Sequence, residues 1–186
     1  MADSLHIPLQ PIDWDAEDVT AAIGEIVTDA LASLDPVHFW PAHPKDDGLP
    51  DGTASFYFGA TGMIWALDYL RQVGAISVPF DFGPVLPRLI ENSRAEFAKR
   101  NYSAHGSLLF GDLGSLLLMM RLRPDAVVAD QIYDRAEANI SLPIRELMWG
   151  MPGSMLACLH MHDMTREARW RPLFNAQATR LLSELE

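Results

Sequence analysis

The sequence has little cysteine, no excess of basic residues and no long apolar run. Its single cysteine, Cys158, excludes an intramolecular disulfide and an all-cysteine metal site. A formal net charge of −11 at pH 7 argues against nucleic acid as a partner. The longest apolar run, residues 115–120, is too short to span a bilayer, and residues 1–15 lack the pattern of a secretion signal. We therefore expect a cytoplasmic protein without a membrane span.

No segment shows the sustained alternation of apolar and polar residues that is typical of a strand. The apolar residues instead recur at helical spacing. Asp15 is expected to cap the first helix, and Pro124 to occupy the first position of the fifth. The predicted helices cover residues 15–34, 63–73, 84–99, 115–122, 124–139, 154–162 and 169–185. This order alternates amphipathic segments with segments that are apolar on nearly all sides.

A helix that is apolar all round must be buried, and an amphipathic one can cover it. The alternation therefore predicts an inner row of helices inside an outer row. We expect one all-α domain over residues 1–186, arranged as a partial α/α toroid. Three inner helices are too few for a ring of six or seven, so the prediction is a half-barrel.

Three short segments, residues 55–62, 107–114 and 146–153, repeat one pattern. Each has a polar residue, two apolar or aromatic residues, an aromatic residue and then Gly-x-x-Gly, and each runs into an apolar helix. Tight packing at one end of the barrel explains these glycines. Alternatively, helix N-termini around one mouth would hold an anionic or carbonyl-bearing ligand. The motif glycines are Gly59, Gly62, Gly111, Gly114, Gly150 and Gly153.

On these motifs the chain resembles the lanthionine synthetase C-like family, most closely over residues 145–157 and the His-rich stretch and Arg169-Trp170 that follow. The resemblance implies an α/α barrel whose inner helices begin at such motifs. It reaches only the N-terminal half of the usual family length. It therefore implies the N-terminal half of a zinc-dependent cyclase that adds thiols to dehydroamino acids in a peptide.

The family's zinc ligands and acid/base histidine belong to later repeats, just before the first glycine. The matching positions here are Tyr57-Phe58, Leu109-Phe110 and Met148-Trp149, none of which is a zinc ligand. The chain alone is therefore expected to have no catalytic residue, metal site or cofactor. Zinc and a peptide substrate are expected only for a full-length member.

Other candidates near the mouth are expected to line a cleft: Tyr57, Phe58, His105, Phe110, Asp112, Glu146 and Trp149. Asp112 and Glu146 would suit a carbohydrate-active toroid, although Glu146 would alternatively pair with Arg145 or a neighbouring repeat. Cys158 and His162 share a helix face but supply only two ligands, and His160 points elsewhere. Trp40, Trp65, Trp149 and Trp170 are assigned to packing between helices.

Two further possibilities concern partners. The helix that reaches Glu186 has no stop signal, which favours a truncated chain whose missing C-terminal half would cover the inner helices. Alternatively, the half-barrel is a non-catalytic interaction module. An exposed seam along its inner helices would then favour a homodimer.

Overall fold

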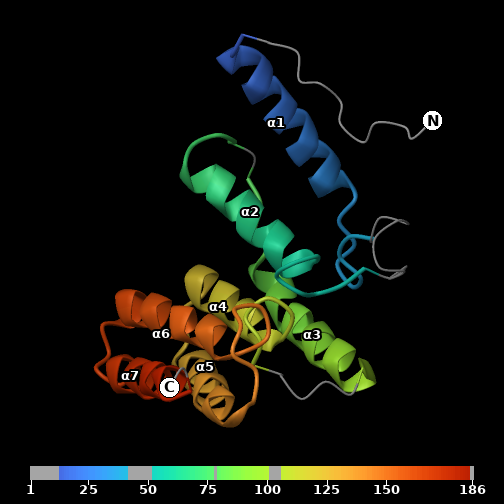
Figure 1. The fold of residues 1–186 in the computed structure, drawn as a ribbon. Coiled ribbons are helices and arrows are strands. Elements are labelled where there is room, and N and C mark those ends of the chain that lie inside the picture. The colour runs from blue at the N-terminus through green and yellow to red at the C-terminus, as the bar shows by residue number, and fades with distance from the viewer. Residues whose placement is uncertain (1–12, 42–51, 78, 101–105, 185–186) are drawn as a thin grey trace, which may run out of the picture.

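The computed structural model describes residues 13–41, 52–77, 79–100 and 106–184 (Figure 1). Within them the regular structure is helical, with one isolated β-bridge between Asp35 and Phe39 and no strand. The prediction of an all-α chain is thus confirmed. The α-helices are α1 (Ala16–Ala32), α2 (Ala60–Gln72), α3 (Leu86–Arg100), α4 (Asp112–Leu122), α5 (Ala126–Ala138), α6 (Met151–Thr165) and α7 (Trp170–Leu182), and the two 3-10 turns are η1 (Gly83–Val85) and η2 (Asn139–Ser141).

The helix starts follow local capping chemistry. Asp15 caps α1 as expected, because its carboxylate accepts hydrogen bonds from the amides of Glu17 and Asp18. The expectation for Pro124 was wrong. Helix α5 begins two residues later and is capped by Asp125, whose carboxylate accepts two backbone N–H bonds. An aspartate oxygen satisfies amides at a helix start, which a proline side chain cannot do.

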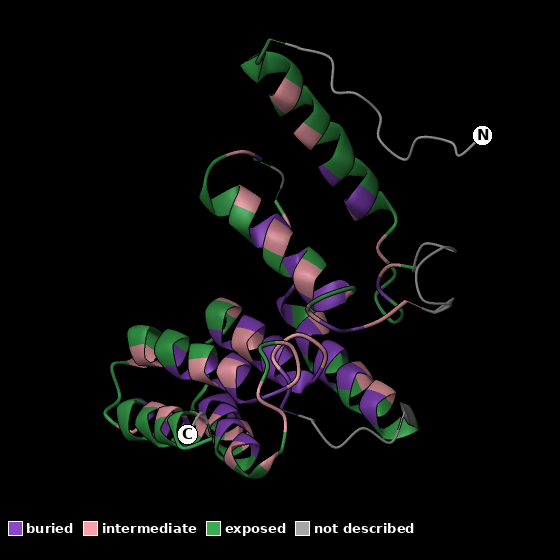
Figure 2. Ribbon diagram, in the orientation of Figure 1, coloured by how far each residue is buried: buried purple, intermediate pink, exposed green. Residues whose placement is uncertain are grey.

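The helices form two adjoining hydrophobic clusters. The first contains side chains from α4, α5, α6 and α7, including Leu116, Ile132 and Trp170, which are all fully buried. The other joins α1 to α3 around Ile64 and Leu86. Helix α4 contributes to both, so it links the two halves of the core. Figure 2 shows that α1, at the N-terminal edge, is the most exposed helix.

The segments predicted to be apolar on all sides differ in burial. Most of α4 is buried, as expected. The expectation was wrong for α2 and α6, which expose large apolar side chains, including Trp65 (38%) and Leu159 (47%). Helix α4 lies between neighbours, since α3 and α5 pack on it and it also contacts α2 and α6. Among the described residues α2 packs mainly on α4, whereas α6 packs on α4, α5 and α7 and still leaves Leu156, Leu159 and Met164 exposed.

Within the described part of the chain, no helix has both the length and the apolar character needed to cross a bilayer.

Candidate functional site

The three repeated loops have the same hydrogen-bond geometry. Ser55 and Ser107 each accept, through Oγ, the backbone N–H three residues later, at 3.2 and 3.1 Å. In the third loop, Glu146 Oε1 does the same for Trp149, at 2.7 Å. In each loop the first motif glycine donates its N–H to the carbonyl of this polar residue at 3.1 Å. The helix then begins at the next residue, with the glycine as its N-cap.

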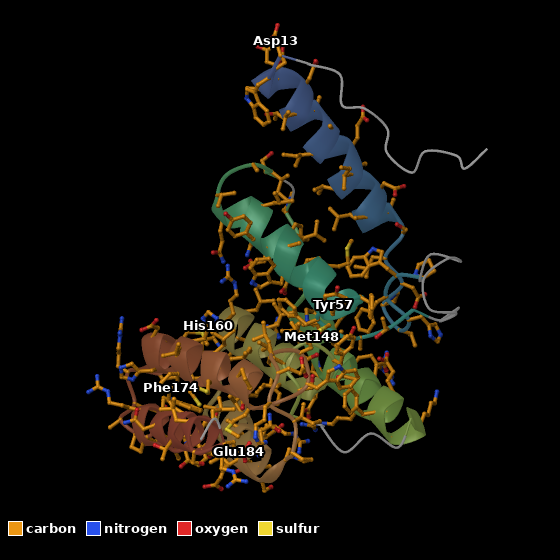
Figure 3. All side chains as sticks on the ribbon, viewed as in Figure 1. Asp13, Tyr57, Met148, His160, Phe174 and Glu184 are labelled. Carbon is orange, nitrogen blue, oxygen red and sulfur yellow. The ribbon has the colours of Figure 1, made fainter. Side chains whose placement is uncertain are left out.

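The loops also bond to one another in a row. The amide of Tyr57 donates to the Leu109 carbonyl at 3.0 Å, and the amide of Leu109 donates to the Met148 carbonyl at 3.4 Å. Figure 3 labels Tyr57 and Met148 near the centre of the molecule, where α2, α4 and α6 start. The row ends differently. The amide of Met148 is accepted by the second oxygen of Glu146, Oε2, at 2.7 Å.

Glycine is required where the helices start because each helix passes close to a backbone carbonyl. A Cβ added to Gly62 would lie 2.2 Å from the Phe56 carbonyl oxygen. A Cβ added to the second glycine of either other loop would also lie against the carbonyl oxygen of the residue six positions earlier. For Gly114 the distance is 2.5 Å, and for Gly153 it is 2.6 Å. These glycines therefore permit close backbone packing.

Aromatic side chains of the three loops lie against one another. The Phe110 ring stacks on Trp149 with centroids 4.3 Å apart, and it also contacts Tyr57 and Phe58 at 5.5 and 5.6 Å. Tyr57 and Phe58 are about half exposed. Four of the residues predicted to line a cleft thus form one aromatic row over the loops.

The two carboxylates considered for glycosidic chemistry are engaged in structural bonds. Asp112 is 2% exposed and is bound by Arg94 Nε at 2.8 Å and by Arg135 at 2.9 Å. Glu146 uses both oxygens on amides of its own loop, while Arg145 pairs with Glu184. The hydrogen bonds of Glu146 within its own loop thus account for the position of its carboxylate, and no ion pair with Arg145 or with a neighbouring repeat is needed.

A second buried aspartate joins α2 to α4. Asp68 is fully buried and accepts bonds from Arg71 at 2.7 Å, Gln72 at 2.7 Å and Arg121 at 2.9 Å. Burial by itself raises the pKa of this carboxyl. The hydrogen bonds from Arg121 and Arg71 outweigh that effect and hold the pKa below its usual value.

The open space in this region is a groove of about 460 Å³ between α2, α4 and α6. Its lining is mostly apolar and includes Trp65 from α2, Leu117 from α4 and Met164 from α6. Three polar side chains also line it, Arg121, His160 and Asp163. The groove has the composition of a binding site, in which apolar walls carry a few polar groups.

The residues do not fit a zinc centre within the described part of the chain, where no three His, Cys, Asp or Glu side chains lie close enough to share a metal ion. Cys158 is 1% exposed, and burial raises the pKa of its thiol to about 12. A thiol held protonated is a poor zinc ligand, since zinc binds the thiolate. His160 is exposed, and His162 Nδ1 lies 3.4 Å from the Glu167 carbonyl. His105 lies outside the described residues.

The sequence analysis missed the groove. Trp65 was assigned to packing, but it lines the groove and stacks on Tyr69 at 5.6 Å. The other three tryptophans assigned to packing do pack: Trp170 is fully buried, the indole N–H of Trp40 donates to the Ala30 carbonyl, and Trp149 stacks on Phe110. The i, i+4 spacing of Trp65 and Tyr69 is a signal that both lie on one helix face, although it does not tell whether that face is covered. No such signal pairs Arg121 with Asp68, which lies 53 residues away.

Comparisons with known proteins found no matching family model, no matching curated protein and no matching solved structure.

Proposed function

We propose that this chain is a non-catalytic helical scaffold of the lanthionine synthetase C-like type, the N-terminal half of an α/α toroid. The observation that carries the proposal is the repeated loop. Three segments far apart in sequence share one set of hydrogen bonds, bond to each other in a row, and each starts a helix at a glycine. In this proposal α2, α4 and α6 are inner helices, and α1, α3, α5 and α7 are outer helices.

The role of the scaffold would be to hold a polypeptide against its inner face. The groove between α2, α4 and α6 is apolar and open, which suits contact with apolar side chains. Three of the described groups that could carry chemistry have other roles. Asp112 and Asp68 are enclosed by arginines, and the Cys158 thiol is buried. Chemistry in a full-length protein would therefore come from residues outside this chain.

One experiment tests the absence of cyclase chemistry. The purified chain is dialysed with zinc, its bound metal is measured, and it is then incubated with a peptide that contains a cysteine and a dehydroalanine. We expect no retained zinc and thiol loss at the uncatalysed rate, equal to that of Cys158→Ala. Stoichiometric zinc together with accelerated thioether formation would overturn the proposal.

A second experiment tests the scaffold itself. Nuclear Overhauser contacts between Tyr57 and Leu109, and between Leu109 and Met148, are expected in solution. Their absence from a folded chain would overturn the arrangement of loops on which the proposal depends.

A further inference from the structure

We propose that a groove along α1 is the docking surface for a basic, partly apolar polypeptide segment of another protein. Helix α1 lies at the N-terminal edge of the molecule, and its groove is separate from the one between α2, α4 and α6 (Figure 1). The inference therefore goes beyond the proposed scaffold role. The evidence is the open groove, the single sign of the charge along α1, and two carboxylates that have no partner among the described residues.

The groove on α1 has a volume of about 730 Å³ and a mostly apolar lining. Its opposite wall is the connection after α2, residues 75–77. On α1 it is lined largely by small residues: Ala21, Gly24, Thr28 and Ala32. A Cβ added to Gly24 would meet no atom within 4 Å, and the first buried side chain of α1 is Val27. A polypeptide segment can therefore approach the backbone of α1 closely.

The charge along α1 has one sign. Residues 13–41 contain seven acidic residues and no lysine or arginine, so they contribute −7 to the formal net charge of −11. None of the ion pairs among the described residues includes a residue of α1. Such a field attracts a basic partner and repels an acidic one. A second copy would bring the same negative charge, and a nucleic acid or an anionic membrane would also be repelled.

Several of these carboxylates have a role within the chain. Asp15 caps α1, and Glu17 and Asp18 lie in its first turn, where the helix dipole stabilises negative charge. Asp35 accepts hydrogen bonds from two backbone amides of the loop that follows α1. The local structure therefore accounts for these four side chains without a partner protein.

Glu25 and Asp29 have no such role. Both are exposed and line the groove, and neither side chain has a hydrogen bond or ion pair among the described residues. They are four residues apart on one helix face, where like charges destabilise a helix. Asp29 also lies in the last turn, which contains no basic residue, and negative charge is unfavourable there. A lysine or arginine of a partner, bound in the groove, would relieve both costs.

Fluorescence anisotropy with labelled synthetic peptides and the full chain tests the proposal. The probe is an amphipathic helical peptide made of leucine and lysine. One control peptide has glutamate in place of each lysine, and the other has serine in place of each leucine. We expect both controls to bind at least about tenfold more weakly than the probe. Added salt should weaken binding of the probe, because it screens exposed charges.

Paired substitutions locate the contact on the chain. Glu25→Gln combined with Asp29→Asn removes two charges from the groove and should weaken binding of the probe by about tenfold. The matched control, Glu137→Gln combined with Asp134→Asn, removes two exposed charges from α5, at the opposite end of the molecule (Figure 1). It should change the affinity by less than about twofold at physiological salt, where distant charges are screened. Both double variants should keep the helical circular dichroism of the parent.

Three results would overturn the inference: no binding of the probe, equal binding of the probe and either control peptide, or an equal loss of affinity in the two double variants. Self-association of the chain that competes with the probe would assign the groove to a second copy and would also overturn it. None of these results changes the contacts between the three loops, so the proposed scaffold is tested separately.

Discussion

Helices α2 and α4 begin in the same way and end in different surroundings. Each follows a glycine N-cap in a loop with the same internal hydrogen bonds, and each holds one buried aspartate bound by two arginines. Yet α4 is enclosed by neighbours, whereas α2 exposes Trp65 and Tyr69. The loop motif therefore determines where a helix starts, and its neighbours determine how much of the helix is buried.

The largest expected effect comes from the motif that the two helices share. Gly114→Ala places a Cβ 2.5 Å from the Leu108 carbonyl oxygen and 3.0 Å from Phe56 Cβ, so the backbone must move. We expect the free energy of unfolding to fall by about 3 kcal/mol, as for other strained core substitutions. Urea unfolding followed by circular dichroism measures this change.

Gly24→Ala on α1 is the matched control, since no atom lies within 4 Å of the added Cβ. It should raise the free energy of unfolding by up to about 1 kcal/mol through helix propensity. An equal change in the free energy of unfolding in Gly114→Ala and Gly24→Ala would show that the loop contacts do not require glycine.

The buried aspartates provide the next test. Asp68→Asn removes a carboxylate bound by Arg71 and Arg121 and should cost about 2 kcal/mol at neutral pH. The pKa of Asp68 is lower in the folded chain than in the unfolded one, so the carboxylate stabilises above its unfolded pKa of about 4. That contribution is lost as the pH falls through the lowered value.

The stability difference between Asp68→Asn and the parent should therefore narrow in acid. Thermal unfolding at a series of pH values below neutral measures it. A difference that does not change with pH would mean that the ion pairs at Asp68 contribute nothing to stability.

A smaller effect is expected at the third loop. Glu146→Ser keeps an oxygen for the amide of Trp149, as in the other two loops, but leaves none for Met148. We expect a loss of about 1 kcal/mol for one hydrogen bond. Hydrogen exchange should accelerate at the Met148 amide and stay slow at Trp149. Acceleration at both amides would show that the serine does not reproduce the loop.

The buried and exposed sides of α6 should differ in how fast a cysteine on each side reacts with a thiol reagent, and this test needs no change in stability. Cys158 is buried and its thiol has a pKa of about 12, so a thiol reagent should react with it only after unfolding. A cysteine placed next to it by Leu159→Cys lies on the exposed side and should react rapidly. Rapid reaction of Cys158 in the parent would contradict this assignment of faces.

The sequence predicted an all-helical chain and the approximate place of each helix, because both depend on local patterns. The helices after the three motifs begin three residues earlier than predicted, directly after the first glycine of each motif. The sequence did not predict which apolar helix would be covered. Leu116 and Trp65 both lie in apolar segments, and only the position of each helix among its neighbours makes one buried and the other 38% exposed. The bonds of Asp68 to Arg121 and of Tyr57 to Leu109 join residues about 50 positions apart. No local spacing encodes such pairs.

The second oxygen of Glu146 has a consequence for how this repeat can evolve. A serine loop leaves one amide for the next loop, so serine loops can be copied in tandem. The glutamate loop uses that amide itself and cannot donate to a following loop through it. A duplicated glutamate loop would therefore interrupt the row, and a loop added after Glu146 would need a contact other than the Met148 amide to join it.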